Sequence, residues 1–512
     1  MNSISRNELI RRTAAQYGAK PAVVTEGRSL TFSEVNYRAN RLANALKDLG
    51  LKPRDRVATL MHNCLEYPEI EFALAKGSFP QVTLNPRLIA TDQLFQIDET
   101  ESVALIVQHE YMDLVKPIRA DLEKVKHIIC FDGNEAGMLE YDKLLSSASV
   151  AEPEGELEPD DLGEIRYTSG TTGKPKGVML QYWSRIAITR NFLCQHLADL
   201  TNEDRFLALQ PLYHGAGWFI FPVWLRGATQ FIVPSFEPEI AFRVIEKEKI
   251  TCIKTVPTVL IRLLDSPEIK SRNLKSIRTI MYGGSPMPAE RLKEAQQLFG
   301  PILANVYGQL EAAMTISFLP KRENIGSRIG SVGRPCIFVS VKLVDEKDKE
   351  VAPGVVGELI IKGDHQMTGY LNRPEATAET LRDGWIHTND LGMSDKEGYI
   401  YLTGGRKTQM IKSGGLVVYP AEVEQVLYKM PAVREVAVIG VPDPVWIEAV
   451  KACVVLKDGY KATEKELIAF CKEHLPGYKA PKSVDFVKEL PHNAAGKVMY
   501  AELRKQYAEA KR

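Results

Sequence analysis

The sequence predicts an α/β protein with a large N-terminal body of α/β subdomains, a β-rich subdomain and a small α+β C-terminal domain. Its 512 residues suggest two to four domains, at roughly 150 residues per domain. The composition, 45% hydrophobic and 25% charged, is typical of globular proteins and excludes disordered and fibrous classes. Helical periodicity alternates with short apolar runs along the chain, which is the pattern of repeated βα units.

The first half of the chain carries this alternation. Residues 33–49 predict a helix, because leucines recur there at helical spacing, and residues 56–61 predict the strand that follows. An acidic stretch with two prolines at residues 146–161 predicts a loop within the body. Further apolar runs lack polar alternation, as expected of parallel strands covered on both faces; they occupy residues 103–107, 128–131 and 206–209.

The last third of the chain has shorter, more β-like segments. A β-rich subdomain is expected near residues 335–405, with strands at 358–361 and 399–402 between glycine turns. Residues 409–512 predict a separate C-terminal domain of about one hundred residues, a common domain size, which leaves 1–408 as the N-terminal domain. The expected elements of this domain are a helix at 420–429, strands at 436–441 and 451–456, a helix at 463–474 and a strand at 483–486.

Charge and composition also limit the partners. The 65 Lys and Arg residues balance the 65 Asp and Glu residues, so no net field favours nucleic acid. The longest apolar stretch, residues 217–225, contains Pro222 and is shorter than the roughly 20 residues of a membrane helix. The N-terminus lacks the pattern of a secretory signal, and the seven scattered cysteines predict reduced thiols in a cytoplasmic protein.

The strongest motif is the loop Tyr167-Thr168-Ser169-Gly170-Thr171-Thr172-Gly173-Lys174-Pro175-Lys176-Gly177-Val178. Its glycines expose backbone N–H groups, its hydroxyls add short donors, and its two lysines supply positive charge, which together favour a phosphate-binding nest. A solvated Ser/Gly turn is the alternative, and the paired lysines between strand-like flanks argue against it. The loop is not a Walker A motif, which needs glycine at Thr168 and Ser or Thr at Pro175.

With this loop and six further motifs, the chain resembles the adenylate-forming superfamily of acyl-CoA synthetases, luciferases and peptide-synthetase adenylation domains. The other motifs occur in order at residues 211–215, 282–285, 307–311, 384–390, 405–407 and 491–497. The resemblance implies a reaction that consumes ATP with Mg²⁺. A carboxylate attacks the α-phosphate and releases pyrophosphate, and the thiol of coenzyme A then displaces AMP. It also implies a mobile C-terminal lid.

The resemblance assigns the catalytic positions. Lys497 matches the lysine that offsets repulsion between carboxylate and polyphosphate. One close charge pair at about 4 Å is worth roughly 4 kcal/mol at an effective dielectric of about 20, or about three decades of rate. Glu311 matches the glutamate associated with magnesium, which prefers carboxylate and phosphate oxygens. His214 matches an aromatic position at the edge of the acyl pocket.

The resemblance also implies the nucleotide contacts. Tyr307 and the Gly283–Gly284–Ser285 segment match the two sides of an adenine site. Asp390 matches the carboxylate that accepts the ribose hydroxyls, and Arg406 a cation near ribose or phosphate. The implied nucleotide-binding set is Thr168, Ser169, Gly170, Thr171, Thr172, Gly173, Lys174, Lys176, Gly283, Gly284, Ser285, Tyr307, Gly308, Gln309, Asp390 and Arg406.

The acyl pocket implied by the resemblance has aromatic and aliphatic walls. Trp218 is expected to shorten it, which favours aromatic, alicyclic or short-to-medium aliphatic acids over long fatty chains. No buried cation is apparent among the walls, and this disfavours acids with a second carboxylate. The implied pocket residues are His214, Trp218, Val256, Tyr282, Val306 and the neighbouring Gly283, Gly284 and Tyr307.

Three positions depart from the family pattern. Leu310 replaces a threonine that hydrogen-bonds phosphate, and the loss of one neutral hydrogen bond, about 0.5–1.5 kcal/mol, should reduce activity without abolishing it. Asn389 replaces a glycine, and asparagine still tolerates a left-handed backbone. Gln409 falls at the charged hinge about which the lid of the family swings.

Two other functions stay open at this point. One keeps adenylation but uses a carrier-protein thiol or another acceptor in place of coenzyme A. The other is a non-catalytic nucleotide-binding relative, suggested by Leu310 and Gln409, although a pure binder has no need of Lys497. Serine hydrolases are excluded because Gly283-Gly284-Ser285 continues as Pro286-Met287, which breaks the Gly-x-Ser-x-Gly pattern. Zinc enzymes are excluded because the sequence has no His-Glu-x-x-His motif and no Cys-x-x-Cys pair. If the chain forms an oligomer, a homodimer is the expected form, because it is the commonest one.

Overall fold

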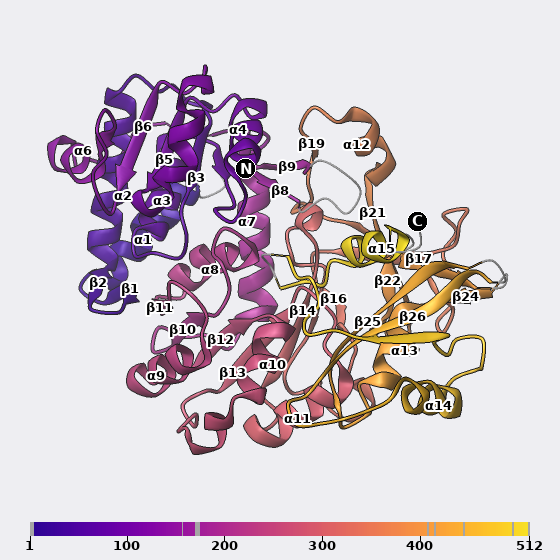
Figure 1. The fold of residues 1–512 in the computed structure, drawn as a ribbon. Helices are drawn as coiled ribbons and strands as arrows, with labels where there is room; N and C mark the ends of the chain where they lie inside the picture. Colours follow the sequence, from indigo (N-terminus) through magenta and orange to yellow (C-terminus); the bar gives the residue numbers. More distant parts are fainter. Residues whose placement is uncertain are drawn as a thin grey trace.

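The computed structural model describes residues 5–155, 157–168, 175–406, 409–413, 416–443, 446–493 and 496–509. In this part of the chain four β-sheets carry the fold, two large ones in the N-terminal body and two small ones that follow (Figure 1). The predicted α/β class is confirmed, with a large body, β-rich sheets and a small C-terminal domain. No described helix is long and apolar enough to cross a bilayer.

The first large sheet has eight strands, and its central strands are parallel. Helix α2 begins where predicted, at a capping box in which Thr31 and Glu34 each satisfy the backbone N–H of the other. In sheet order the strands are β19 (Gly369–Tyr370), β9 (Gly177–Gln181), β8 (Leu162–Tyr167), β4 (Gln81–Thr83), β3 (Val57–Leu60), β5 (Ala104–Gln108), β6 (His127–Phe131) and β7 (Leu139–Glu140). Its helices are α1 (Arg6–Tyr17), α2 (Phe32–Asp48), α3 (Tyr67–Gly77), α4 (Ala90–Glu99), α5 (Met112–Val115), α6 (Tyr141–Ser147) and α7 (Tyr182–Asn191).

The second large sheet has nine strands, with a parallel centre. In sheet order they are β16 (Arg334–Pro335), β15 (Ser317–Leu319), β14 (Leu303–Tyr307), β13 (Thr279–Gly283), β12 (Cys252–Thr255), β10 (Arg205–Ala208), β11 (Thr229–Ile232), β1 (Pro21–Thr25) and β2 (Arg28–Thr31). Its helices are α8 (Ile220–Leu225), α9 (Pro238–Glu248), α10 (Pro257–Asp265) and α11 (Ala289–Phe299).

Both faces of this second sheet are covered, as the sequence predicts. Along β10, Phe206 belongs to the core on one face and Leu207 to the core on the other. The same alternation separates Cys252 from Ile253 on β12. Burial on both faces explains why these strands read as continuous apolar runs. The β1–β2 hairpin at the sheet edge was not predicted.

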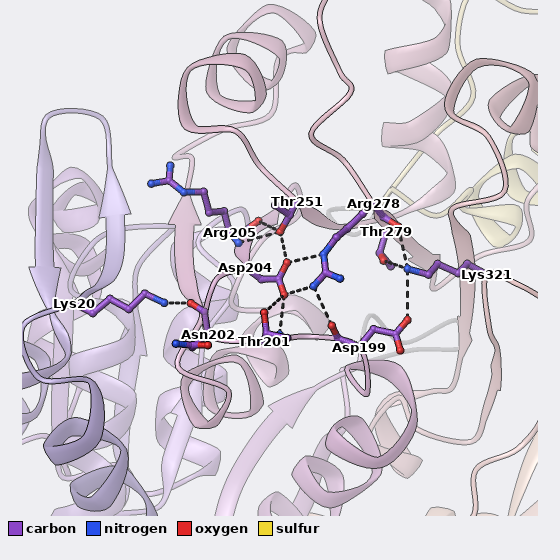
Figure 2. A network of polar contacts seen from close by, with 10 residues as sticks. All are labelled: Lys20, Asp199, Thr201, Asn202, Asp204, Arg205, Thr251, Arg278, Thr279 and Lys321. Carbon is purple, nitrogen blue, oxygen red and sulfur yellow. Dashed lines mark hydrogen bonds and ion pairs between the residues drawn. The ribbon is translucent and has the colours of Figure 1, made fainter.

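A polar network joins the amino-terminal ends of the parallel strands (Figure 2). Asp204, just before β10, accepts hydrogen bonds from Thr251 and from the Arg278 guanidinium. Burial opposes ionisation of Asp204, but these hydrogen bonds and the Thr201 amide hold its pKa below the ordinary value. The network ties β10, β12 and β13 together at the sheet end opposite to their carboxyl ends.

The two small sheets follow in sequence. The third contains β17 (Ser340–Val344), β18 (Gly357–Lys362), β21 (Trp385–Ser394), β20 (Leu381–Arg382) and β22 (Ile400–Arg406), with α12 (Pro374–Thr380). The fourth contains β24 (Leu416–Val418), β23 (Ile411–Ser413), β26 (Ile447–Leu456), β25 (Val433–Asp443) and β27 (Ser483–Phe486). Its helices are α13 (Pro420–Leu427), α14 (Glu464–His474) and the unpredicted α15 (Tyr500–Glu509). Helix α13 contacts β22, so these sheets lie side by side (Figure 1).

Candidate active site

The predicted site residues gather at the carboxyl ends of the parallel strands in the nine-stranded sheet. Strand β10 leads to His214, β12 to Val256, β13 ends at Gly283 and β14 at Tyr307. Carboxyl ends of parallel strands meet at one sheet edge, where open α/β sheets bind ligands. The motifs that lie far apart in the sequence therefore meet at one place.

Two motif glycines are required by backbone packing. A Cβ atom on Gly283 would lie 1.9 Å from the carbonyl oxygen of Val306, and one on Gly308 would lie 2.3 Å from the backbone of Met314. Both distances are far below van der Waals contact, so only glycine fits. These glycines allow the ends of β13 and β14 to lie close to neighbouring backbone.

Tyr307 and Asp390 meet although they come from different sheets. The Tyr307 hydroxyl donates a hydrogen bond to Oδ2 of Asp390 over 2.7 Å. Asn389, beside Asp390, has a φ of 60°, so the expectation that asparagine takes over the left-handed backbone of the usual glycine is confirmed. Arg406 lies opposite Asp390 in the pairing of β21 with β22. The predicted adenine and ribose positions thus lie in contact.

A second group joins the phosphate loop to Glu311. The Tyr370 hydroxyl donates to Oε1 of Glu311 over 2.8 Å, and the Lys176 ammonium lies 4.9 Å from the centre of the Tyr370 ring. The Thr168 amide donates to the Lys176 carbonyl over 3.0 Å and closes the base of the loop. The predicted loop residues Ser169, Gly170, Thr171, Thr172, Gly173 and Lys174 lie outside the described residues.

The donor set at Glu311 fits magnesium bound together with phosphate. Mg²⁺ is usually held by one or two carboxylates and by substrate phosphates, not by an all-protein cage. Glu311 supplies one carboxylate beside the cationic Lys176, and the described residues contain no cluster of three or more possible metal ligands. Glu311 is therefore the residue that would hold the metal.

The backbone after Leu310 is unusual. Leu310 opens a short 3₁₀ helix (Leu310–Ala312), and its side chain packs on the large core and offers no hydroxyl. Gln309 precedes it, and its carbonyl accepts from the amides of Ala312 and Met314. Ala313 and Met314 then adopt left-handed φ values of 40° and 62°. Such conformations in non-glycine residues are strained and cluster at functional sites.

The turn that carries Lys497 is seated on the N-terminal body. Asn493 donates its amide to the Lys497 carbonyl over 2.8 Å, and its side-chain oxygen accepts from the Lys497 amide over 2.9 Å. Gly496 has a φ of +75°, and a Cβ there would lie 2.5 Å from Oγ1 of Thr258 and 3.7 Å from Val256. The lid therefore contacts the start of α10 through Gly496, immediately before Lys497.

His214 is held as a neutral imidazole. Burial lowers its pKa to about 3, and the positive charges of Arg166, Lys497 and Arg87 act in the same direction. Its Nε2 atom is buried without a hydrogen-bond partner among the described residues.

The predicted pocket walls are only partly brought together. Val256, Val306 and Trp218 are buried, and the last two belong to one core. The Tyr282 side chain lies in the core on the other face of the sheet, where its hydroxyl accepts from Asn324 over 3.1 Å. Adjacent strand residues point to opposite faces, so Tyr282 cannot share the face of Val306, which lies opposite Gly283.

Sequence reasoning missed two kinds of residue around this pocket. The first is the buried pair of Glu164 and Arg166, which holds the turn from His214 to Trp218: Arg166 donates to the His214 carbonyl over 2.7 Å, and the Trp218 indole donates to Glu164 over 3.2 Å. The second is Lys254, fully buried two residues before Val256. The expectation that no cation is buried near these walls is therefore wrong.

The expected hinge residue Gln409 contacts the last helix. Its carbonyl accepts a hydrogen bond from the Arg504 guanidinium over 2.9 Å. The third sheet ends at Arg406 and the fourth begins at Ile411, so Gln409 lies in the short connection between them.

Comparisons with known proteins agree with this architecture. A family model described as AMP-binding enzyme matches residues 10–371, and one described as AMP-binding enzyme C-terminal domain matches residues 422–497. A feruloyl-CoA synthase from Amycolatopsis sp is 36% identical over 95% of this chain and 96% of its own. An indoleacetate–CoA ligase from Aromatoleum aromaticum is 33% identical over 98% of both chains.

A solved structure has the same fold. The anthranilate CoA ligase AuaEII in complex with anthranoyl-AMP superposes with a TM-score of 0.93 at 27% identity, covering 99% of this chain and 98% of that one. The chain belongs to the AMP-binding enzymes, and within that family it is an AMP-forming acid–CoA ligase. Its substrates are therefore ATP, coenzyme A and a small carboxylic acid.

Proposed function

We propose that this ligase activates aromatic acids, with alicyclic and short-to-medium aliphatic acids as weaker substrates. The observation that supports the proposal is the approach of Gly496, next to Lys497, to Thr258 and Val256, because Val256 is a predicted wall of the acyl pocket. The relatives and the solved structure act on ferulate, indoleacetate and anthranilate by their names, and all three acids are aromatic.

In the first step the acid carboxylate attacks the α-phosphate of ATP, and pyrophosphate leaves. Two anions must approach, and Lys497 would supply the compensating positive charge. A charge pair at about 4 Å is worth roughly 4 kcal/mol at an effective dielectric of about 20. Because burial keeps His214 neutral, its imidazole adds no charge of its own.

The nucleotide would be held by the two contact groups described above. Tyr307 offers an aromatic face to adenine while its hydroxyl orients Asp390 toward the ribose. Lys176 would face the phosphates. Mg²⁺ held at Glu311 would neutralise phosphate charge, and Tyr370 keeps that carboxylate oriented.

In the second step the thiol of coenzyme A attacks the acyl carbonyl and AMP leaves. We propose that residues 409–512 form the mobile lid, that residues 1–408 form the body, and that the lid pivots at Gln409. The short connection between Arg406 and Ile411 supports this, because a hinge needs a few element-terminal residues that absorb a backbone rotation.

The test is pyrophosphate release by the purified protein with ATP and Mg²⁺ across benzoate, cinnamate, phenylacetate, cyclohexanecarboxylate and hexanoate, each with and without coenzyme A. Turnover that requires an aromatic acid and coenzyme A is the expected result. A single burst that coenzyme A does not change would point to a carrier-protein or other acceptor. Silence with every acid, despite ATP binding, would contradict the proposal and favour a non-catalytic relative.

A cytoplasmic location and a homodimer are also proposals. The absence of a described membrane-crossing helix is compatible with the first. Light scattering of the purified chain tests the second, because a dimer doubles the mass of 57.3 kDa.

A further inference from the structure

Lys254 is the feature of this chain that the reaction described above does not use. It lies on β12, paired with Ala208 of β10 and with Met281 of β13. Both neighbours belong to the same core as Trp218 and Val306, on the face of the sheet opposite to Tyr282. The Lys254 side chain is fully buried.

The ammonium group of Lys254 has neutral partners only. It donates to Oε1 of Gln210 over 3.1 Å and to the Thr255 carbonyl over 2.7 Å, and it lies 5.9 Å from the centre of the Phe219 ring. No carboxylate among the described residues forms an ion pair with it. Burial lowers its pKa to about 7. An ammonium has three N–H donors, and these two acceptors leave one direction open.

A second buried lysine in the same chain shows how a structural lysine is accommodated. Lys76 is equally buried, and it forms an ion pair with Glu152 over 2.5 Å and a hydrogen bond with Asn40 over 2.8 Å. A buried charge without a counter-ion is costly, so it is rarely found without a function. Lys254 has no carboxylate partner of the kind that Lys76 has. The position of Lys254 next to the predicted acyl pocket offers an explanation for this difference.

Every contact of Lys254 leads to a predicted wall of the acyl pocket. Thr255 directly precedes Val256, Phe219 directly follows Trp218, and Gln210 begins the segment that reaches His214. Lys254 lies two residues below Val256 on the strand, about 6.6 Å at 3.3 Å per residue. The acid carboxylate must lie at the upper end of the pocket, near Lys497, so Lys254 faces the opposite end of a bound acid.

We propose that Lys254, held by Gln210, is the polar floor of the acyl pocket and binds an oxygen substituent at the far end of the acid. This deepens the proposed function and rests on it. The preferred substrates are then aryl acids with a distal hydroxyl group, or acids with a second carboxylate.

The test compares matched pairs of acids in pyrophosphate release: 4-hydroxycinnamate with cinnamate, 4-hydroxyphenylacetate with phenylacetate, and adipate with hexanoate. The unaltered enzyme is expected to favour the oxygenated member by about 10- to 100-fold in kcat/KM, the range for a hydrogen bond to a charged group. Lys254→Met should remove that preference and keep turnover of the unsubstituted acid within a few-fold. The first two pairs test a hydroxyl group, and the third tests a carboxylate.

Lys321→Met, a lysine change far from the pocket in the network of Figure 2, is the control and should keep the preference. If Lys254→Met does not fold, Gln210→Leu is used in its place, because it removes the hydrogen-bond acceptor that orients the Lys254 ammonium. The role of Lys254 would be overturned if the unaltered enzyme and the variant had the same ratio of kcat/KM for the oxygenated acid to that for the unsubstituted acid. It would also be overturned if the unaltered enzyme showed no preference in any pair. The absence of turnover with every acid would instead overturn the proposed function.

Discussion

Arg166 and Glu164 show how single residues shape this site without touching a substrate. Both are buried on β8, directly before the phosphate loop, and both hold the turn from His214 to Trp218. Arg185 lies 3.8 Å from the same Glu164 carboxylate. The pair is therefore a positioning device that links the strand of the phosphate loop to the edge of the acyl pocket.

Arg166→Met is expected to raise the KM for the acid and to lower kcat, because the His214 carbonyl loses its donor and the buried Glu164 keeps only the more distant Arg185 as a counter-ion. Breaking a buried pair costs about 3–5 kcal/mol of folding stability. The double variant Glu164→Gln with Arg166→Met should regain part of that stability, measured by thermal unfolding. A double variant less stable than the single one would contradict the paired role.

Lys497→Ala should lose adenylation by about a thousandfold, which corresponds to the roughly 4 kcal/mol of one close charge pair. Thioester formation from a preformed acyl-adenylate should change by less than tenfold. The two half-reactions are measured by pyrophosphate exchange and by consumption of synthetic adenylate with coenzyme A. Equal losses in both would show that Lys497 does not act specifically in the first step.

At the scale of elements, the Lys497 turn approaches the start of helix α10, where the proposed lid would meet the body. The contact consists of Gly496 against Thr258 and Val256, so it depends on the absence of a side chain at one position. Thr258 Oγ1 is buried there without a hydrogen-bond partner among the described residues. A contact made by a single glycine is suited to the proposed lid, which must move away from the body between the two steps.

Gly496→Ala is expected to slow adenylation by at least tenfold and to spare thioester formation, because the new Cβ would meet Thr258 at 2.5 Å and keep Lys497 from its place. Gly459→Ala is the matched control. Gly459 has a similar φ of +78° in the same domain, but nothing lies within 4 Å of its Cβ position. The control carries the same backbone strain, so only the contact distinguishes the two variants in the pyrophosphate assay.

Glu424 makes the stability of the C-terminal domain depend on pH. It lies on α13, and Oε1 accepts from the Val438 amide and from the Tyr500 hydroxyl, each over 2.8 Å. Burial raises its pKa from the ordinary 4.5 to about 7. The folded domain therefore binds the proton more tightly than the unfolded chain, and stability falls as pH rises from about 4.5 to about 7.

Glu424→Gln is expected to stabilise the domain at pH 8 by about 2–3 kcal/mol and to change little at pH 4.5, because the neutral amide keeps both hydrogen bonds without a buried charge. Chemical unfolding at the two pH values measures the difference. A variant that is less stable than the unaltered chain at pH 8 would show that the carboxylate is compensated in the folded state.

At the scale of the whole molecule, chemistry and stability are placed at opposite ends of the nine-stranded sheet. The carboxyl ends carry His214, Val256 and Tyr307, and the amino-terminal ends carry the Asp204–Arg278 network of Figure 2. Asp204→Asn should lower the melting temperature, because the Arg278 guanidinium loses a charged acceptor. The KM values of the remaining folded enzyme should be unchanged. A change in the KM for ATP would show that the two ends are coupled.

Much of the fold could be predicted from the sequence because local patterns carry it. Apolar runs without alternation marked the parallel strands, and leucines at helical spacing marked α2, whose start is fixed by a capping box at Thr31 and Glu34. The edge hairpin β1–β2 and helix α15 were missed. The hairpin is short and partly exposed, and α15 has a weak apolar pattern, so each owes its existence to neighbours distant in sequence.

The sequence by itself determined the reaction class, because the motifs at 167–178, 307–311 and 491–497 and their order need no coordinates to be recognised. Only the tertiary structure decided which side chains share a face and which charges lose water. It turned Tyr282 away from Val306, placed Gly496 on Thr258 and buried Lys254 without a counter-ion. These three placements depend on contacts between segments that lie far apart in the chain. The burial of a lysine within an apolar strand cannot be predicted from the strand alone, because it depends on which elements cover the two faces of the sheet.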